Sequence, residues 1–154
     1  MDPWIWIAGG VVGLVLVVWL LRRLRTFGGV VQVERAKEMF RLQRERLEAH
    51  FVRAASQSGK PRGLLWKDCQ FQNDTHYVRE RKTGQIAALV GVTIAFEAVP
   101  GGDMEGLPAV NNLRTASAVF FFQAGHWLTV GKAVFNMSPD EAIRHFQNQY
   151  ERLD

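Results

Sequence analysis

The feature that most constrains this chain is a run of eighteen uncharged residues near its start. The run covers residues 4–21 and reads WIWIAGGVVGLVLVVWLL. At about 1.5 Å per residue, a helix of this length spans about 27 Å, close to the hydrocarbon thickness of a bilayer. Trp4, Trp6 and Trp19 lie near the ends of the run, where indole rings favour the headgroup boundary. The run therefore predicts a transmembrane anchor within residues 1–25.

A cleaved signal peptide is the alternative interpretation of this run. Such a peptide needs a positive start, a shorter apolar core and a cleavage site of small residues. The chain instead begins Met-Asp-Pro, and Arg22, Arg23 and Arg25 directly follow the apolar run. Because positive residues concentrate on the cytoplasmic side, we expect an uncleaved, single-pass protein of the cell inner membrane. Its N-terminus would lie outside and its C-terminal domain in the cytoplasm.

Two glycines in the run provide a candidate contact between copies of the chain. Gly9 and Gly13 have the G-x-x-x-G spacing that lets two membrane helices approach closely. Glycine is also common in membrane helices that do not dimerise. A homodimer through this face is therefore one of two interpretations.

Charge is distributed unevenly along the chain. Residues 22–62 contain eleven lysines and arginines against four acidic residues, whereas residues 63–154 contain eight against ten. Basic side chains beside a membrane attract anionic lipid headgroups. A nucleic-acid-binding domain needs its basic face on the folded part. We therefore expect membrane lipid as a partner and no nucleic acid.

After the anchor, the pattern predicts a short linker and one soluble domain. We expect a linker over residues 26–32, because Gly28 and Gly29 disfavour a continuous helix. Apolar residues then recur with helical spacing over residues 33–57, and a polar segment follows. Residues 33–154 are numerous enough for one hydrophobic core.

Alternating and apolar segments predict an antiparallel sheet over residues 64–135. We expect a strand at 64–72, a hairpin of 75–81 with 86–99, and a second hairpin of 113–122 with 127–135. The segment 86–99 is apolar on both faces, which is typical of a central strand covered on both sides. In the second hairpin, Phe122 should face Trp127 and Ala118 should face Gly131.

A capping box at Ser138-Pro139-Asp140-Glu141 predicts a last helix over residues 139–152. The order of helix, about five strands and helix indicates an α+β fold in which the long amphipathic helix packs on the sheet. In outline alone, this arrangement resembles the cystatin-like and NTF2-like folds.

Four segments carry a family resemblance that covers nearly the whole chain: VERAKEMFRLQRERLEAHF, SGKPRGLLWKDCQF, LVGVTIAFEAVPGGDMEG and AVFNMSPDEA. They resemble an uncharacterised family of small, single-pass, membrane-anchored bacterial proteins. The resemblance implies the same layout of anchor and soluble domain, and it implies no activity.

Residues that often carry chemistry do not form a catalytic, cofactor or metal pattern in the sequence. Cys69 alternates with apolar residues, so a buried thiol is a better interpretation than a nucleophile. The four histidines lack ligand spacing, and Glu97, Asp103 and Glu105 do not match a calcium-binding loop. We therefore expect no catalytic residue, metal or cofactor.

A long loop over residues 100–112 is a candidate partner-binding segment. Its candidate contacts are Asp103, Met104, Glu105 and Leu107. Long irregular loops in compact domains often bind partners, although an ordinary connector is an equally good interpretation.

Two functions from different classes fit these expectations, and we favour the first. The first is a membrane-tethered interaction or scaffold domain without catalysis, which binds a protein partner or a second copy. The second is a protein, or an enzyme, that binds a small apolar ligand in a pocket lined by Phe120, Phe122 and Trp127. A third possibility is that the basic segment senses anionic lipid.

Overall fold

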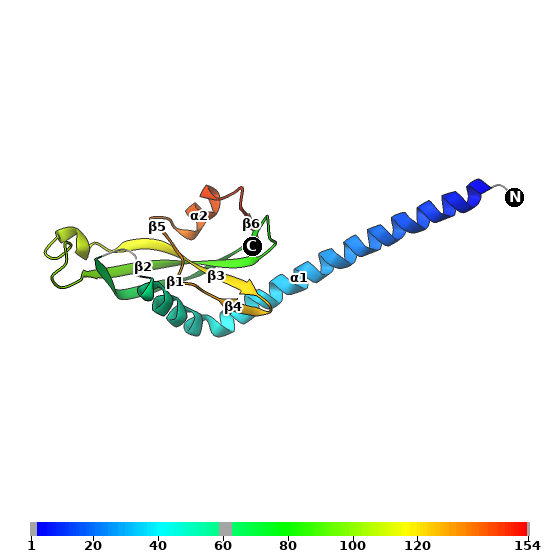
Figure 1. Cartoon of the computed structure of the whole chain (residues 1–154). Coiled ribbons are helices and arrows are strands. Elements are labelled where there is room, and N and C mark those ends of the chain that lie inside the picture. Colours follow the sequence, from blue (N-terminus) through cyan, green and yellow to red (C-terminus); the bar gives the residue numbers. More distant parts are fainter. Residues whose placement is uncertain (1–2, 59–62, 154) are drawn as a thin grey trace. The chain divides into compact units, whose positions relative to one another are not determined.

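The computed structural model describes the backbone of residues 3–58 and 63–153, and the side chains of residues 16–17, 29–58 and 63–153. The chain divides into two compact units, Met1–Arg35 and Ala36–Asp154. Helix α1 (Pro3–Gln57) contributes to both units (Figure 1). All the strands and the second helix belong to the second unit.

Among the residues that the structure describes, no helix is long and apolar enough to cross a membrane. The anchor predicted over residues 4–21 lies outside the described side chains, except for Leu16 and Val17. The side chains of Arg22, Arg23 and Arg25 and the Gly9–Gly13 face lie outside them as well. The anchor, its orientation and its dimer face therefore stay predictions.

The interruption predicted at Gly28 and Gly29 is wrong, because the backbone of α1 is helical throughout residues 26–32. A glycine inside a helix costs about 1 kcal/mol relative to alanine. Good helix formers are frequent from Glu34 onward, including Glu34, Ala36 and Lys37, and they extend the helix beyond the valines that follow Gly29. Once a helix is nucleated, each added residue gains a hydrogen bond, so two glycines lower its stability without ending it.

Within the described residues, six strands form one antiparallel sheet with the order β4-β3-β2-β1-β6, and β5 also pairs with β3. The strands are β1 (Leu64–Glu80), β2 (Ile86–Ala98), β3 (Arg114–Gln123), β4 (His126–Leu128), β5 (Ala133–Phe135) and β6 (Tyr150–Arg152). Strand β2 lies between β1 and β3 and is buried along most of its length. The α+β class and the central position of this strand are thus confirmed.

Strand β1 replaces the two separate strands predicted at 64–72 and 75–81. A register shift between Phe71 and Thr75 accommodates the polar residues that were expected to end the first strand. A second shift between Trp66 and Asp68 changes which residues face the core. Trp66 packs against Phe96, with ring centroids 5.4 Å apart, while Leu65 is exposed. Because of this bulge, the side chains of β1 that face the core are not those expected from a strict alternation along the strand.

The paired residues of β2 and β3 define two sheet faces. The α1 face carries Ala88, paired with Phe120, and Val90, paired with Ala118. Its cover is the part of α1 over residues 36–57, where Phe40 and Phe51 both contact the Phe120 ring. The opposite face, here called the α2 face, buries a smaller cluster that includes Leu89 and Ile143.

The second hairpin is confirmed at its turn but not along its whole length. Phe122 pairs with Trp127 as predicted, around a turn in which Ala124 and Gly125 have positive φ. Ala118, however, pairs with Ala133 and not with Gly131. The segment 129–132 leaves the ladder, because Gly131 approaches the α1 backbone: a Cβ there would lie 2.3 Å from Ala55 N.

The last predicted helix is shorter than expected. The capping box is present, since Ser138 Oγ accepts from Glu141 N and the Glu141 carboxylate accepts from Ser138 N, and α2 covers Pro139–His145. The prediction of helix to residue 152 is wrong, because Tyr150–Arg152 forms β6. Pairing with the outer edge of β1 gives this segment backbone partners that a solvent-exposed last turn lacks.

Candidate functional site

A groove of about 340 Å³ lies on the surface between α1 and β4. Helix α1 contributes side chains at helical spacings of three, four and seven residues, which place them on one side of the helix. Strand β4 and the residue after it form the other wall. The lining residues are Gln43, Arg46, Leu47, His50, His126, Trp127, Leu128 and Thr129.

The floor of the groove is apolar and fixed in place. Leu47 and Trp127 are buried, at 5% and 4% exposure. Trp127 Nε1 donates to Ala36 O at 2.8 Å, which satisfies the buried indole and ties β4 to α1. The indole also packs edge-on against Phe40, with ring centroids 4.9 Å apart. A partner would therefore meet a preformed surface.

The wall formed by β4 follows from local turn chemistry. The tight turn at Ala124-Gly125 places His126 at the start of β4, with His126 Nδ1 2.9 Å from Ala124 O. At the other end, Thr129 Oγ1 donates to Val119 O and accepts from Gly131 N. These side-chain bonds replace ladder bonds where the strand stops. The exposed Leu128 is held between these two ends.

The rim of the groove carries one arginine and two histidines. Arg46, His50 and His126 are exposed, and the lining that the structure describes includes no aspartate or glutamate. Two other arginines of α1 are paired: Arg41 with Glu38 at 2.8 Å and Arg44 with Glu48 at 2.7 Å. The guanidinium of Arg44 also donates to carbonyl oxygens of the β1 bulge, at Gln72 and Asn73.

Arg46 differs from these two arginines, because it forms no hydrogen bond or ion pair with any residue that the structure describes. A guanidinium presents five donors in a planar fork that matches a carboxylate. The groove therefore combines an apolar floor with a rim cation that is available to an anionic group.

The three residues predicted to line an apolar pocket lie in different surroundings. Trp127 lines the groove. Phe120 is fully buried and contacts Phe40 and Phe51 at centroid distances of 5.3 and 5.8 Å. Phe122 packs against the Trp127 ring. These rings fill the space where the α1 side of the hairpin was expected to leave a hollow.

The loop over residues 99–112 is ordered by its own bonds. Glu105 Oε2 accepts from Gly101 N at 2.7 Å, and a 3-10 helix, η1 (Pro108–Asn111), buries Val110. Met104 lies close to Gly63, where a Cβ would be 3.0 Å from Met104 Cγ. Asp103 and Leu107 are exposed. In this loop Asp103 and Leu107 are accessible, whereas Met104 and Glu105 have internal contacts, and partner binding by the loop stays a prediction.

Cys69 is poorly suited to act as a nucleophile. Burial, and then the Asp68 charge, raise the pKa of its thiol to about 11, which disfavours the thiolate. Cys69 pairs with Ile94 on the α1 face, whereas His76 pairs with Leu89 on the α2 face. The sheet therefore separates the thiol from the histidine that is nearest in sequence.

His76 belongs to a polar cluster that joins three elements. His76 Nδ1 lies 3.0 Å from Arg152 Nη2 and 3.6 Å from Asp140 Oδ1. Arg152 also donates to Asp140, and this hydrogen bond lowers the pKa of the Asp140 carboxyl. The cluster ties β1, α2 and β6 together. Among the described residues, no group of three or more His, Cys, Asp or Glu side chains could hold a metal ion.

The groove was missed in the sequence because its two walls are far apart along the chain. His50 and His126 are separated by 75 intervening residues, and Arg46 faces away from the apolar sector of its helix. One usable signal was the spacing of Gln43, Arg46, Leu47 and His50, which marks a mixed edge of α1. Comparison of the chain with family models, with curated proteins and with solved structures gave no significant match.

Proposed function

We propose that this chain is a membrane-tethered interaction domain that binds a protein partner in the α1–β4 groove and has no catalytic activity of its own. The groove is the observation that carries this proposal. Its buried tryptophan, its exposed Leu128 and Arg46, which is unpaired among the described residues, have the composition of an interface centre, where tryptophan and arginine supply most binding energy.

The tether is proposed from the sequence of the first unit. The uncharged run over residues 4–21 is followed by Arg22, Arg23 and Arg25, which favour the cytoplasmic side and anionic headgroups. In this arrangement the second unit is held in the cytoplasm beside the inner membrane. A homodimer through Gly9 and Gly13 would present two grooves and raise the affinity for a bivalent partner.

The alternative, a small apolar ligand held inside the domain, has weaker support. Rings of Phe40, Phe51 and Phe120 fill the α1 side of the sheet. On the α2 side, a cavity of about 60 Å³ lies beside Leu89 and Tyr150. Ligand pockets commonly measure about 300–1,000 Å³, so this cavity is too small for an ordinary ligand.

Photo-crosslinking in native membranes tests the proposal. The full chain would carry a photoreactive amino acid at Leu128 or, as the matched control, at Leu113. Both leucines are exposed, at 51% and 67%, but Leu113 does not line the groove. We expect a discrete protein adduct from position 128, none from position 113, and retention of the chain in the membrane after alkaline extraction.

Three results would count against the proposal. Equal labelling from both positions would indicate nonspecific contact. Extraction of the intact chain as a soluble protein would exclude the tether. An adduct between two copies of this chain would identify the groove as a homodimer interface and exclude a separate partner.

A further inference from the structure

The charge of the groove restricts what kind of surface binds there. Arg46, His50 and His126 are exposed along its rim, with Gln43 and Thr129 as neutral polar neighbours. A partner that places a basic side chain here would meet like charge. A partner with carboxylates would meet the exposed guanidinium of Arg46, and a bidentate pair there adds specificity as well as attraction.

The shape of the groove restricts the partner further. On α1 the lining extends from Gln43 to His50, which is two helical turns or about 10 Å. Strand β4 is three residues long, so its edge offers few backbone bonds to an added strand. Two turns of helix beside an apolar floor match the helix-in-groove mode of recognition, in which side chains spaced three or four residues apart enter the groove.

We propose that the segment bound in this groove is an amphipathic helix of another protein, with leucine-like side chains on its buried side and acidic side chains on its flank. The inference rests on the proposed function and specifies the chemistry of the partner. The apolar side chains contact Leu47, Trp127 and Leu128. The flanking carboxylates bind Arg46 and lie beside His50.

A bilayer surface is a poorer occupant than a helix. Leu47 and Trp127 are buried below an exposed rim, and a planar layer of headgroups does not reach a concave floor. A single ridge of helix side chains does reach it. An isolated small anion would use the rim and leave the floor uncovered.

Two synthetic helices with the same leucine face test the charge preference. One carries glutamate and the other carries lysine on the polar face, and each is titrated into the full chain in phosphatidylcholine nanodiscs by fluorescence anisotropy. We expect the acidic peptide to bind about tenfold more tightly or better, with an affinity that falls as salt is added.

Substitutions in this chain test whether the acidic peptide binds in the groove. We expect Arg46→Gln to weaken acidic-peptide binding about fivefold, the effect of removing one exposed ion pair. Leu128→Asp should weaken it more, because it removes an apolar contact and adds a like charge. The control Lys67→Gln makes the same charge change as Arg46→Gln, on strand β1, which β2 and β3 separate from β4, and it should leave binding unchanged.

Several results would overturn the inference. These are equal binding of the two peptides, equal effects of Arg46→Gln and Lys67→Gln, and displacement of the peptide by phosphatidylglycerol vesicles. If Leu128 still crosslinks a protein in native membranes while the peptides do not discriminate, the proposed function stands and the acidic helix does not. If neither experiment gives a signal from the groove, both proposals fail.

Discussion

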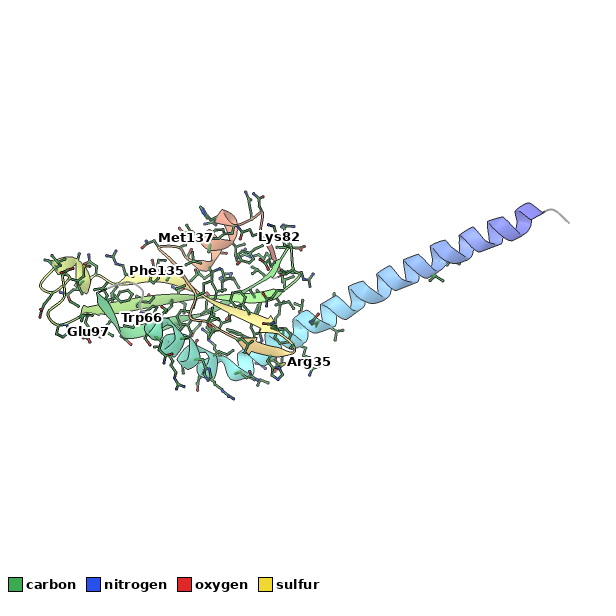
Figure 2. The ribbon with its side chains drawn as sticks, viewed as in Figure 1. Arg35, Trp66, Lys82, Glu97, Phe135 and Met137 are labelled. Atoms are coloured by element: carbon green, nitrogen blue, oxygen red, sulfur yellow. The ribbon has the colours of Figure 1, made fainter. Side chains whose placement is uncertain are left out.

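The two faces of the sheet are covered in different ways. On the α1 face, a long helix places Phe40 and Phe51 against rings from β1, β3 and β4. On the α2 face, the cover is a seven-residue helix with the segment around Val134 and Met137. Figure 2 labels Met137 on the α2 side of the sheet. One layer is filled by rings, and the other leaves a cavity of about 60 Å³.

Because of this difference, the two faces of the sheet contribute differently to the stability of the domain. The α1 face buries its largest side chains completely, including Phe40, Phe51 and Phe120, so we infer that it contributes most of the stability. The α2 face holds the end of the chain against β1 and leaves the loop end of the sheet open, where Leu65 and Leu113 are exposed. The groove lies on the better-packed side, which gives it a rigid floor.

The largest expected difference comes from truncating one core side chain on each face. Phe40→Ala should lower the free energy of unfolding by about 3–5 kcal/mol, because a fully buried ring loses its contacts and leaves a cavity. Ile143→Ala on the α2 face should cost about 2 kcal/mol, since Ile143 is 8% exposed in a loosely packed layer. Denaturant unfolding of the full chain in mild detergent, followed by tryptophan fluorescence, measures both.

Equal losses from these two variants would contradict the division between the faces. A much larger loss from Ile143→Ala would mean that the small α2 layer, and not the aromatic layer, stabilises the sheet.

Substitutions at two glycines, Gly131 and Gly84, test how closely α1 packs against the segment 129–132. Gly131→Ala should cost about 3 kcal/mol, because its Cβ would lie 2.3 Å from Ala55 N and its φ is +71°. Gly84→Ala is the matched control, with φ +73° but no atom within 4 Å of the added Cβ. It should cost only about 1–2 kcal/mol from backbone strain. Equal losses would mean that α1 moves aside without cost.

A methylene added on each face should have opposite effects of about 1 kcal/mol. Val119 lines the small cavity of the α2 face, so Val119→Ile should stabilise by up to about 0.8 kcal/mol. Val90 is fully buried under α1, and Val90→Ile should destabilise by about 1 kcal/mol or more. Thermal unfolding of the two variants side by side measures the contrast. Destabilisation by both would indicate that the cavity cannot accept an added methylene.

The parts of this fold that the sequence predicted are those governed by local chemistry. The capping box at Ser138, the turn at Ala124-Gly125 and the doubly apolar β2 all depend on neighbouring residues. Two of the errors arose where a distant segment decides the outcome. Tyr150–Arg152 is a strand because β1 offers an edge, and residues 129–132 leave the ladder because α1 lies against Gly131.

The groove depends on distant contacts in the same way. Trp127 was singled out as a pocket residue, but its indole is fixed by a hydrogen bond to Ala36, 91 residues earlier in the chain. A single sequence does not reveal that pairing. Arg46 has the appearance of an ordinary solvated helix charge until its neighbours Arg41 and Arg44 are found to be paired.

The smallest expected effect concerns the polar cluster that closes the α2 face. The Arg152 hydrogen bond lowers the pKa of Asp140 in the folded state. A carboxyl with a lowered folded pKa adds stability above its unfolded pKa of about 4, and this stability is lost as the pH falls through the folded value. Asp140→Asn should therefore reduce the loss of stability between about pH 5 and pH 2, measured by denaturant unfolding at each pH.

Arg152→Gln is the partner variant, because it removes the source of the lowered pKa. If the two residues act as one pair, each single variant should reduce the pH dependence of the unfolding free energy by the same amount. The double variant should then reduce it no further. Additive effects would mean that Asp140 draws its stabilisation from elsewhere, such as the neighbouring Arg144 or His76. In that case the polar cluster would help to orient α2 but would not stabilise the position of β6. The comparison of the faces would then narrow to their apolar layers, and β6 would be held by its backbone pairing with β1 and by the packing of Tyr150 on the α2-face cluster.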